Sequence, residues 1–125
     1  MSLCRGAGLL AAALILLALA GGGNGQSPPA GKELFAKRCG GCHALDREKE
    51  GPRLGGVYGR PSASVPSFDY SPALKQARIE WNMDSLDRWL TDPDQFAPGT
   101  DMAFRLDKPG ERRAIIDYLR GLSGK

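Results

Sequence analysis

The segment Cys39-Gly40-Gly41-Cys42-His43 constrains this chain of 125 residues more than any other part of it. Two cysteines three positions apart, with a histidine directly after the second, form the C-x-x-C-H pattern of covalent haem attachment. The spacing has a chemical reason, because the two thiols add to the two vinyl groups of one haem and the adjacent imidazole reaches the iron as an axial ligand. We therefore expect thioether bonds at Cys39 and Cys42 and iron ligation by His43.

Three other interpretations of the motif are weaker. A redox-active C-x-x-C of the thioredoxin kind occurs in a βαβ context, and no run of buried strands is predicted near it. A structural zinc site needs four ligands, whereas this chain has one histidine and three cysteines, and Cys4 is remote from the other two. A chance match would leave the matching pattern further along the chain unexplained.

Length and charge restrict the function further. A chain of this length suffices for one small domain with a modest core, in which a large flat apolar cofactor would be a major component. The 17 Lys and Arg residues against 14 Asp and Glu residues give a net charge of only +3, and no tract of Lys and Arg or basic stripe interleaved with aromatic residues is present. We therefore do not expect nucleic acid as a partner.

The first 20 residues resemble a cleaved signal peptide. A short basic start with Arg5 precedes an unbroken apolar run over residues 9–20, and Ala18-Leu19-Ala20 matches the small-x-small site before cleavage. The alternative is an uncleaved membrane anchor, although twelve apolar residues are short for a bilayer, which needs about 20. Residues 21–30 (GGGNGQSPPA) are predicted to form a flexible linker, and residues 31–125 the folded domain.

The remaining pattern predicts about four helices and no sheet. The first should span residues 31–42 and carry the haem cysteines. The second should follow Ser71 as N-cap through residue 78, and the last should span residues 109–121 and pack against the first. Residues 55–70 are rich in Gly, Pro and Ser and are expected to be irregular.

A third helix is predicted over residues 82–92, with Asn82 as N-cap and Pro93 as its end. Leu86, Trp89 and Leu90 lie at i, i+3 and i+4 and form an apolar stripe, so Trp89 is assigned to the core.

Four residues are candidates for supporting a haem. The carbonyl of Pro52 could accept the second N–H of His43 and so fix the tautomer of a ligating imidazole; an ordinary turn proline is the alternative. Arg60 and Tyr70 offer the donors that buried carboxylates require, and the indole N–H of Trp81 needs a partner when buried.

Met102 is the candidate for the second axial ligand. It lies in the extended segment Phe96-Ala97-Pro98-Gly99-Thr100-Asp101-Met102, from which a thioether can approach a metal without distorting a helix. Soft sulfur suits haem iron and raises its potential. Met83, in the first turn of a predicted helix, is better explained by packing or exposure.

From about Gly31 to Ser123 the chain resembles the class I cytochromes c, that is, mitochondrial-type cytochrome c and its bacterial relatives. The matching pieces follow one another in family order, namely CGGCH, GPRLGGVYGR, FDYSPAL, Trp81, WLTDP, PGTDMAF and IIDYLRGL. The resemblance implies thioethers at Cys39 and Cys42, a proximal ligand His43, a distal ligand Met102 and a Pro52 carbonyl that holds His43. It also implies Arg60, Tyr70 and Trp81 around the haem propionates, and Phe104 near the haem edge.

Three features depart from the mitochondrial pattern. The loop between His43 and Gly51 is short, Trp89 replaces a tyrosine near the methionine, and Asp101 stands where a lysine is common. The last departure weakens any transfer of docking through a ring of lysines.

The sequence thus predicts a small all-α cytochrome c fold around one covalent haem c with its iron. The expected function is one-electron transfer between redox proteins, such as an oxidase, a reductase or a dehydrogenase, by a periplasmic monomer without stable membrane insertion. The alternatives are a haem enzyme or gas sensor with a labile methionine ligand, and a dedicated electron-transfer subunit of a dehydrogenase.

Overall fold

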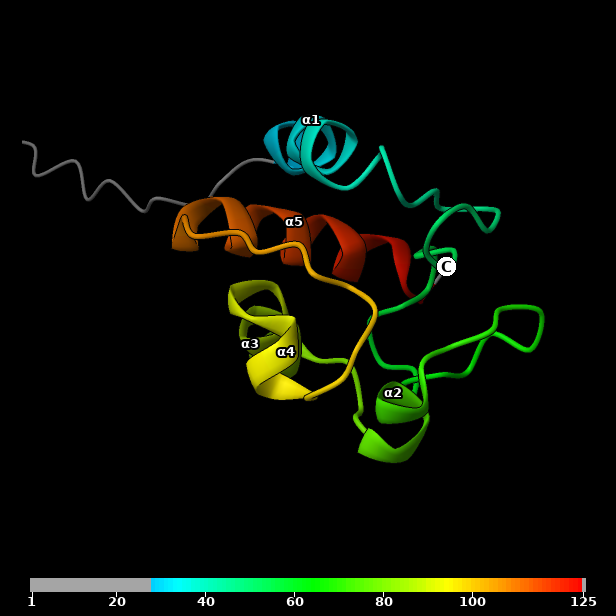
Figure 1. Ribbon diagram of the computed structural model, residues 1–125. Helices are drawn as coiled ribbons and strands as arrows, with labels where there is room; N and C mark the ends of the chain where they lie inside the picture. The colour runs from blue at the N-terminus through cyan, green and yellow to red at the C-terminus, as the bar shows by residue number, and fades with distance from the viewer. Residues whose placement is uncertain (1–27, 125) are drawn as a thin grey trace, which may run out of the picture.

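The computed structural model describes residues 28–124, which form five α-helices joined by long irregular segments (Figure 1). Within this part of the chain the only β-type pairing is one isolated bridge between Pro61 and Glu80, so the all-α expectation is confirmed. The predicted signal peptide and residues 21–27 of the predicted linker lie outside the described residues. Among the residues described, no helix combines the length and the apolar character needed to cross a membrane.

Helix α1 (Pro28–Arg38) is the first element, and its limits differ from those predicted. It begins three residues before Gly31, so residues 28–30 belong to the helix and not to a linker. Proline is well suited to the first turn of a helix, because an N–H at that position would have no partner within the helix. It ends before the cysteines, because the N–H groups of Cys39 and Gly40 both bind the carbonyl of Phe35. The cysteines therefore lie in a turn after the helix.

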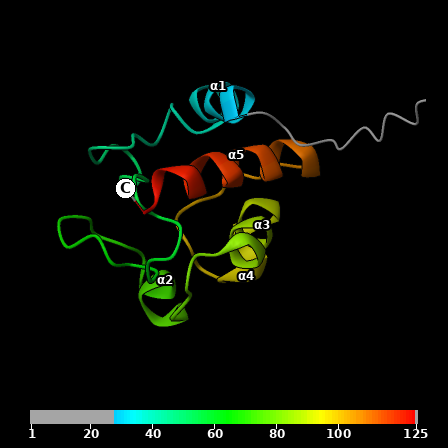
Figure 2. The ribbon, with the colours of Figure 1, turned by 180° about the vertical axis from the view of Figure 1, so that it is seen from behind.

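Helix α5 (Pro109–Leu122) crosses α1, as predicted, and forms the centre of the fold (Figures 1 and 2). Its Ile115 and Ile116 are almost completely buried. Gly31 marks the closest approach, because a Cβ there would overlap the carbonyl oxygen of Ala114 and lie 2.8 Å from the Cβ of Tyr118. The crossing is closed by Arg38 and Glu111, whose charged groups are 2.9 Å apart.

Helices α2 (Pro72–Ala77) and α3 (Met83–Thr91) begin at the caps that the sequence predicted. The Ser71 hydroxyl accepts the N–H of Leu74 at 3.2 Å. At α3, Asn82 and Ser85 form a reciprocal capping box, in which each side chain accepts the other residue's N–H at 2.9–3.0 Å. These local bonds fix where α3 begins and hence which face it presents to α5.

Helix α4 (Pro93–Phe96) was not predicted; with this single turn the described residues form five helices, against about four expected. Pro93 ends α3 as expected, but it also opens a single new turn, because the Asp92 carboxylate accepts the N–H of Gln95 at 3.0 Å. The methionine segment (residues 97–107) then returns to α5 without regular structure.

Candidate haem site

The histidine segment (residues 39–60) is held together by backbone bonds between its two halves. The N–H of Gly51 binds the carbonyl of Cys42 at 2.9 Å, and the N–H groups of Leu54 and Gly55 bind the carbonyls of residues 44 and 45. The chain after His43 therefore doubles back within a few residues and places the Gly51-Pro52 dipeptide beside the imidazole.

The His43 ring is positioned from two directions. Its Nδ1 donates to the carbonyl oxygen of Pro52 at 2.8 Å, which leaves Nε2 as the nitrogen without a proton in the neutral ring. On the other side, any Cβ at residue 51 would overlap the ring, so only glycine fits there. Burial lowers the pKa of His43, the Pro52 bond opposes this, and Lys49 lowers it further. The ring is thus held in the neutral form that binds metals.

The two motif cysteines differ in exposure, and neither forms a disulfide with another described residue. Cys42 is exposed, whereas Cys39 is half-buried, and burial together with Cys42 raises the pKa of Cys39 to about 11. A redox-active dithiol needs a lowered pKa, so this environment argues against the thioredoxin-like interpretation. Within residues 28–124 no group of three or more His, Cys, Asp and Glu side chains is arranged to hold a metal ion.

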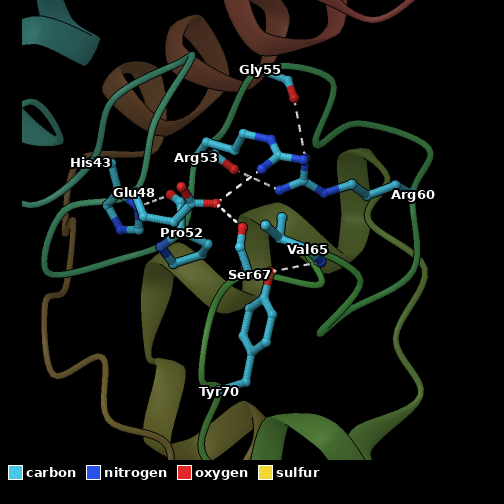
Figure 3. A network of polar contacts seen from close by, with 9 residues as sticks. All are labelled: His43, Glu48, Pro52, Arg53, Gly55, Arg60, Val65, Ser67 and Tyr70. Atoms are coloured by element: carbon cyan, nitrogen blue, oxygen red, sulfur yellow. Dashed lines mark hydrogen bonds and ion pairs between the residues drawn. The ribbon is translucent and has the colours of Figure 1, made fainter.

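Arg60 anchors the irregular loop next to His43 (Figure 3). Its guanidinium donates to the carbonyls of Arg53 at 2.7 Å and Gly55 at 3.1 Å, and burial lowers its pKa. The Tyr70 hydroxyl accepts the N–H of Val65 at 3.2 Å. Arg60 and Tyr70 thus lie in the same network as Pro52 in this view, with their polar groups bound to backbone.

Trp81 connects this network to the other half of the site. Its backbone pairs with Gly59 and Arg60 at 2.6 and 3.1 Å, and its indole lies edge-on to that of Trp89 with centroids 5.4 Å apart. Both indoles are buried.

Met102 is held by the second tryptophan of this pair. The Nε1–H of Trp89 donates to the Met102 sulfur at 3.2 Å. Trp89 is buried as the apolar stripe predicted, but its N–H is used at the candidate site, which the assignment to the core missed. Met83 is half-buried and packs against the core.

The far end of the methionine segment is fixed by α3 and α5. After Ala97, Leu106 is the one buried residue of the segment. The N–H of Leu106 binds the carbonyl of Leu90 at 2.8 Å, and the carbonyl of Leu106 accepts a hydrogen bond from Arg112 at 2.8 Å. The Arg112 side chain is only 10% exposed and also bonds Asp87 at 2.7 Å. Helical spacing places Arg112 on the apolar stripe of α5, three residues before Ile115 and seven before Leu119, whereas Arg113 lies outside that stripe.

With this geometry in view, comparison with known proteins identifies the family. A model of the cytochrome c family matches residues 29–123. The chain is a member of the cytochrome c family. It is 44% identical over 93 residues to cytochrome c of Cochliobolus lunatus, covering 71% of this chain and 86% of that protein. With cytochrome c of Arabidopsis thaliana the identity is 43% over 93 residues, covering 71% and 83%.

Among solved structures, cytochrome cH from Methylobacterium extorquens superposes on this cytochrome with a TM-score of 0.72 at 34% identity, covering 77% of this chain and 99% of the other. These findings confirm the predicted class I cytochrome c fold, a covalently bound haem c with its iron, and electron carriage between redox proteins. The residues present fit that cofactor, since two thiols follow α1 and the imidazole has Nδ1 satisfied with Nε2 available.

Proposed function

We propose that this cytochrome is a monohaem, one-electron carrier whose iron is ligated by His43 and Met102. One observation supports the proposal most strongly. Each candidate ligand is positioned by a hydrogen bond that leaves another atom or lone pair free to bind iron. His43 is held through Nδ1, and Met102 accepts one hydrogen bond on a sulfur that has a second lone pair.

In this proposal the protein holds the cofactor and sets its properties, while haem iron supplies the one-electron chemistry when it is bound. Cys39 and Cys42 form the two thioether bonds. Pro52 orients His43, and Trp89 orients Met102. Ligation by both His43 and Met102 would leave no coordination site for a substrate, and little would have to rearrange when the charge changes by one.

The contribution of Arg60, Tyr70 and Trp81 is proposed to be a polar surround for the haem propionates. Their buried or half-buried donors lie on one network beside the histidine segment. The Arg60 guanidinium donates to backbone carbonyls, and the Tyr70 hydroxyl accepts a backbone N–H. Binding of the propionates would therefore involve rotation of the Arg60 and Tyr70 side chains.

Replacing the methionine tests the distal ligand. Met102→Ala should open a coordination site, so that the reduced variant binds carbon monoxide and its potential falls with the loss of the soft ligand. Met83→Ala is the matched control; it should change neither property and should cost only packing, about 1–3 kcal/mol. Carbon monoxide binding to the wild type as fast as to Met102→Ala would instead support a haem enzyme or a gas sensor.

We further propose that the protein is an exported monomer, released after cleavage behind Ala20. The support is the apolar run over residues 9–20 followed by the small-x-small site, together with the extracytoplasmic attachment expected for bacterial haem of this type. Intact mass of the haem protein tests it: a chain that begins near Gly21 is expected, and one in the membrane fraction that retains residues 1–20 would contradict it.

A further inference from the structure

The weak net charge of this chain conceals a strong separation of charge along it. Residues 80–107, which we call the acidic region, carry seven acidic and two basic side chains, net −5. Residues 28–79 carry nine basic and five acidic side chains, net +4, and residues 108–125 carry five and two, net +3. The acidic region comprises α3, α4 and the methionine segment, whereas helix α1, which belongs to the basic residues 28–79, lies across α5 from α3 and α4 in both views (Figures 1 and 2).

Negative charge is concentrated around Met102. Asp101 is exposed and precedes it directly, and the exposed Asp94 reaches the same segment, since its carboxylate accepts the N–H of Gly99 at 3.1 Å. The single basic residue of the methionine segment, Arg105, is paired with Asp92 at 3.0 Å. Its charge is therefore compensated, and the net charge that the segment presents to solvent is negative.

The same segment presents apolar surface. Phe104, 39% exposed, is the one large hydrophobic side chain among the described residues that stands out into solvent, and its neighbour Ala103 and Pro98 are exposed as well. Met102 itself is half-buried below them. Phe104, Ala103 and Pro98 thus expose apolar surface beside charged residues, and aromatic residues are enriched in protein interfaces.

We propose that the methionine segment, with Phe104 at its centre and Asp94 and Asp101 beside it, docks a redox protein whose own contact surface is basic. The inference rests on the proposed function, because ligation by Met102 places this segment next to the point where the electron leaves. Complementary charge raises the association rate and selects the orientation of the encounter. An acidic partner would be repelled from this segment and drawn to the basic residues 28–79 or to α5.

Electrodes of opposite charge test the inference on the haem-loaded protein. Gold coated with an amine-terminated alkanethiol imitates a basic partner, and gold coated with a carboxylate-terminated alkanethiol imitates an acidic one. Voltammetry then gives the electron-exchange rate of the adsorbed protein on each surface. We expect faster exchange on the amine surface. Asp101→Lys should lower that rate at least about fivefold at low ionic strength, and the isosteric Asp101→Asn should lower it less.

Glu50→Lys is the matched control, because it makes the same charge change at an exposed position of the histidine segment. At an ionic strength of about 0.15 M, where the Debye length is about 8 Å, it should leave the rate on the amine surface within about twofold of wild type, whereas Asp101→Lys should still lower that rate. Faster exchange on the carboxylate surface, or equal losses from Asp101→Lys and Glu50→Lys, would overturn the docking inference alone. The absence of a one-electron wave on either surface would instead contradict the proposed function.

Discussion

The histidine segment and the methionine segment each hold one candidate ligand in place. They differ in the sequence separation of the contacts that do so. His43 is oriented by Gly51 and Pro52, eight and nine residues away, within a loop closed by its own backbone bonds. Met102 is oriented by Trp89 of α3 and by a segment that Arg112 of α5 secures.

This difference has a physical consequence. A ligand held by local contacts keeps its position as long as its loop is folded, whereas a ligand held from α3 and α5 depends on the packing of those helices. Parts of a protein with few buried contacts open at lower free energy than the core. Each segment has a single buried residue, Val57 in residues 39–60 and Leu106 in residues 98–107, but only the histidine segment is closed by backbone hydrogen bonds between its own two halves. We therefore expect Met102 to be the more easily released ligand.

The largest effect is expected at Gly51. A Cβ there overlaps the His43 ring, so Gly51→Ala should displace the imidazole and abolish the low-spin haem spectrum. Gly41→Ala is the matched control, because a methyl group added at Gly41 would meet no other atom within 4 Å. If the two variants have the same absorption spectrum, the histidine is not held as described.

Arg112→Ala should have the next largest effect, and that effect should fall on the methionine segment. It removes the donor to the Leu106 carbonyl and breaks the ion pair with Asp87, and bonds of this charged kind contribute about 1.5–3 kcal/mol. Chemical denaturation should show a loss of stability in this range, and carbon monoxide should reach the reduced iron faster because the methionine segment is released.

Arg113→Ala provides the control for Arg112, since Arg113 is exposed and pairs with Asp117 on the same helix. It should change stability by less than about 0.5 kcal/mol. A similar gain in carbon monoxide binding in both variants would show that α5 does not anchor the methionine segment through Arg112.

Trp89→Phe is expected to have the smallest effect. It keeps an aromatic ring in the core but removes the N–H that donates to the Met102 sulfur. The positive end of that N–H favours the less positively charged ferrous state, so its loss should lower the potential. A hydrogen bond of about 1 kcal/mol corresponds to a few tens of millivolts. Tyr118→Phe, on α5 against Phe35, should leave the potential unchanged; equal shifts in both would exclude a specific role of the bond.

The two segments also differ in how far the sequence could predict them. The C-x-x-C-H motif and the Gly51-Pro52 dipeptide lie close together in the chain, so the contact between His43 and Pro52 could be proposed before any coordinates. Met102 could be proposed from its residue type and loop. The family resemblance placed Trp89 near the methionine, but the hydrogen bond from its indole to the sulfur and the anchoring by Arg112 were not predicted, because both depend on how α3 and α5 pack.

Local chemistry explains the successes and the errors in the helices. Ser71 and Asn82 form side-chain caps within three residues, and these caps were predicted. The end of α1 before Cys39 and the extra turn α4 were not. The end of α1 depends on two N–H groups that share the Phe35 carbonyl, and the start of α4 depends on the Asp92 carboxylate. Helix propensity alone does not predict such boundaries.

The absorption spectrum of the oxidised wild-type protein at neutral pH tests the central claim most directly. Ligation by His43 and Met102 predicts a low-spin spectrum with the weak long-wavelength band of a sulfur–iron bond, lost in Met102→Ala and retained in Met83→Ala. A wild-type spectrum without that band, or a band that disappears in Met83→Ala and persists in Met102→Ala, would contradict the account.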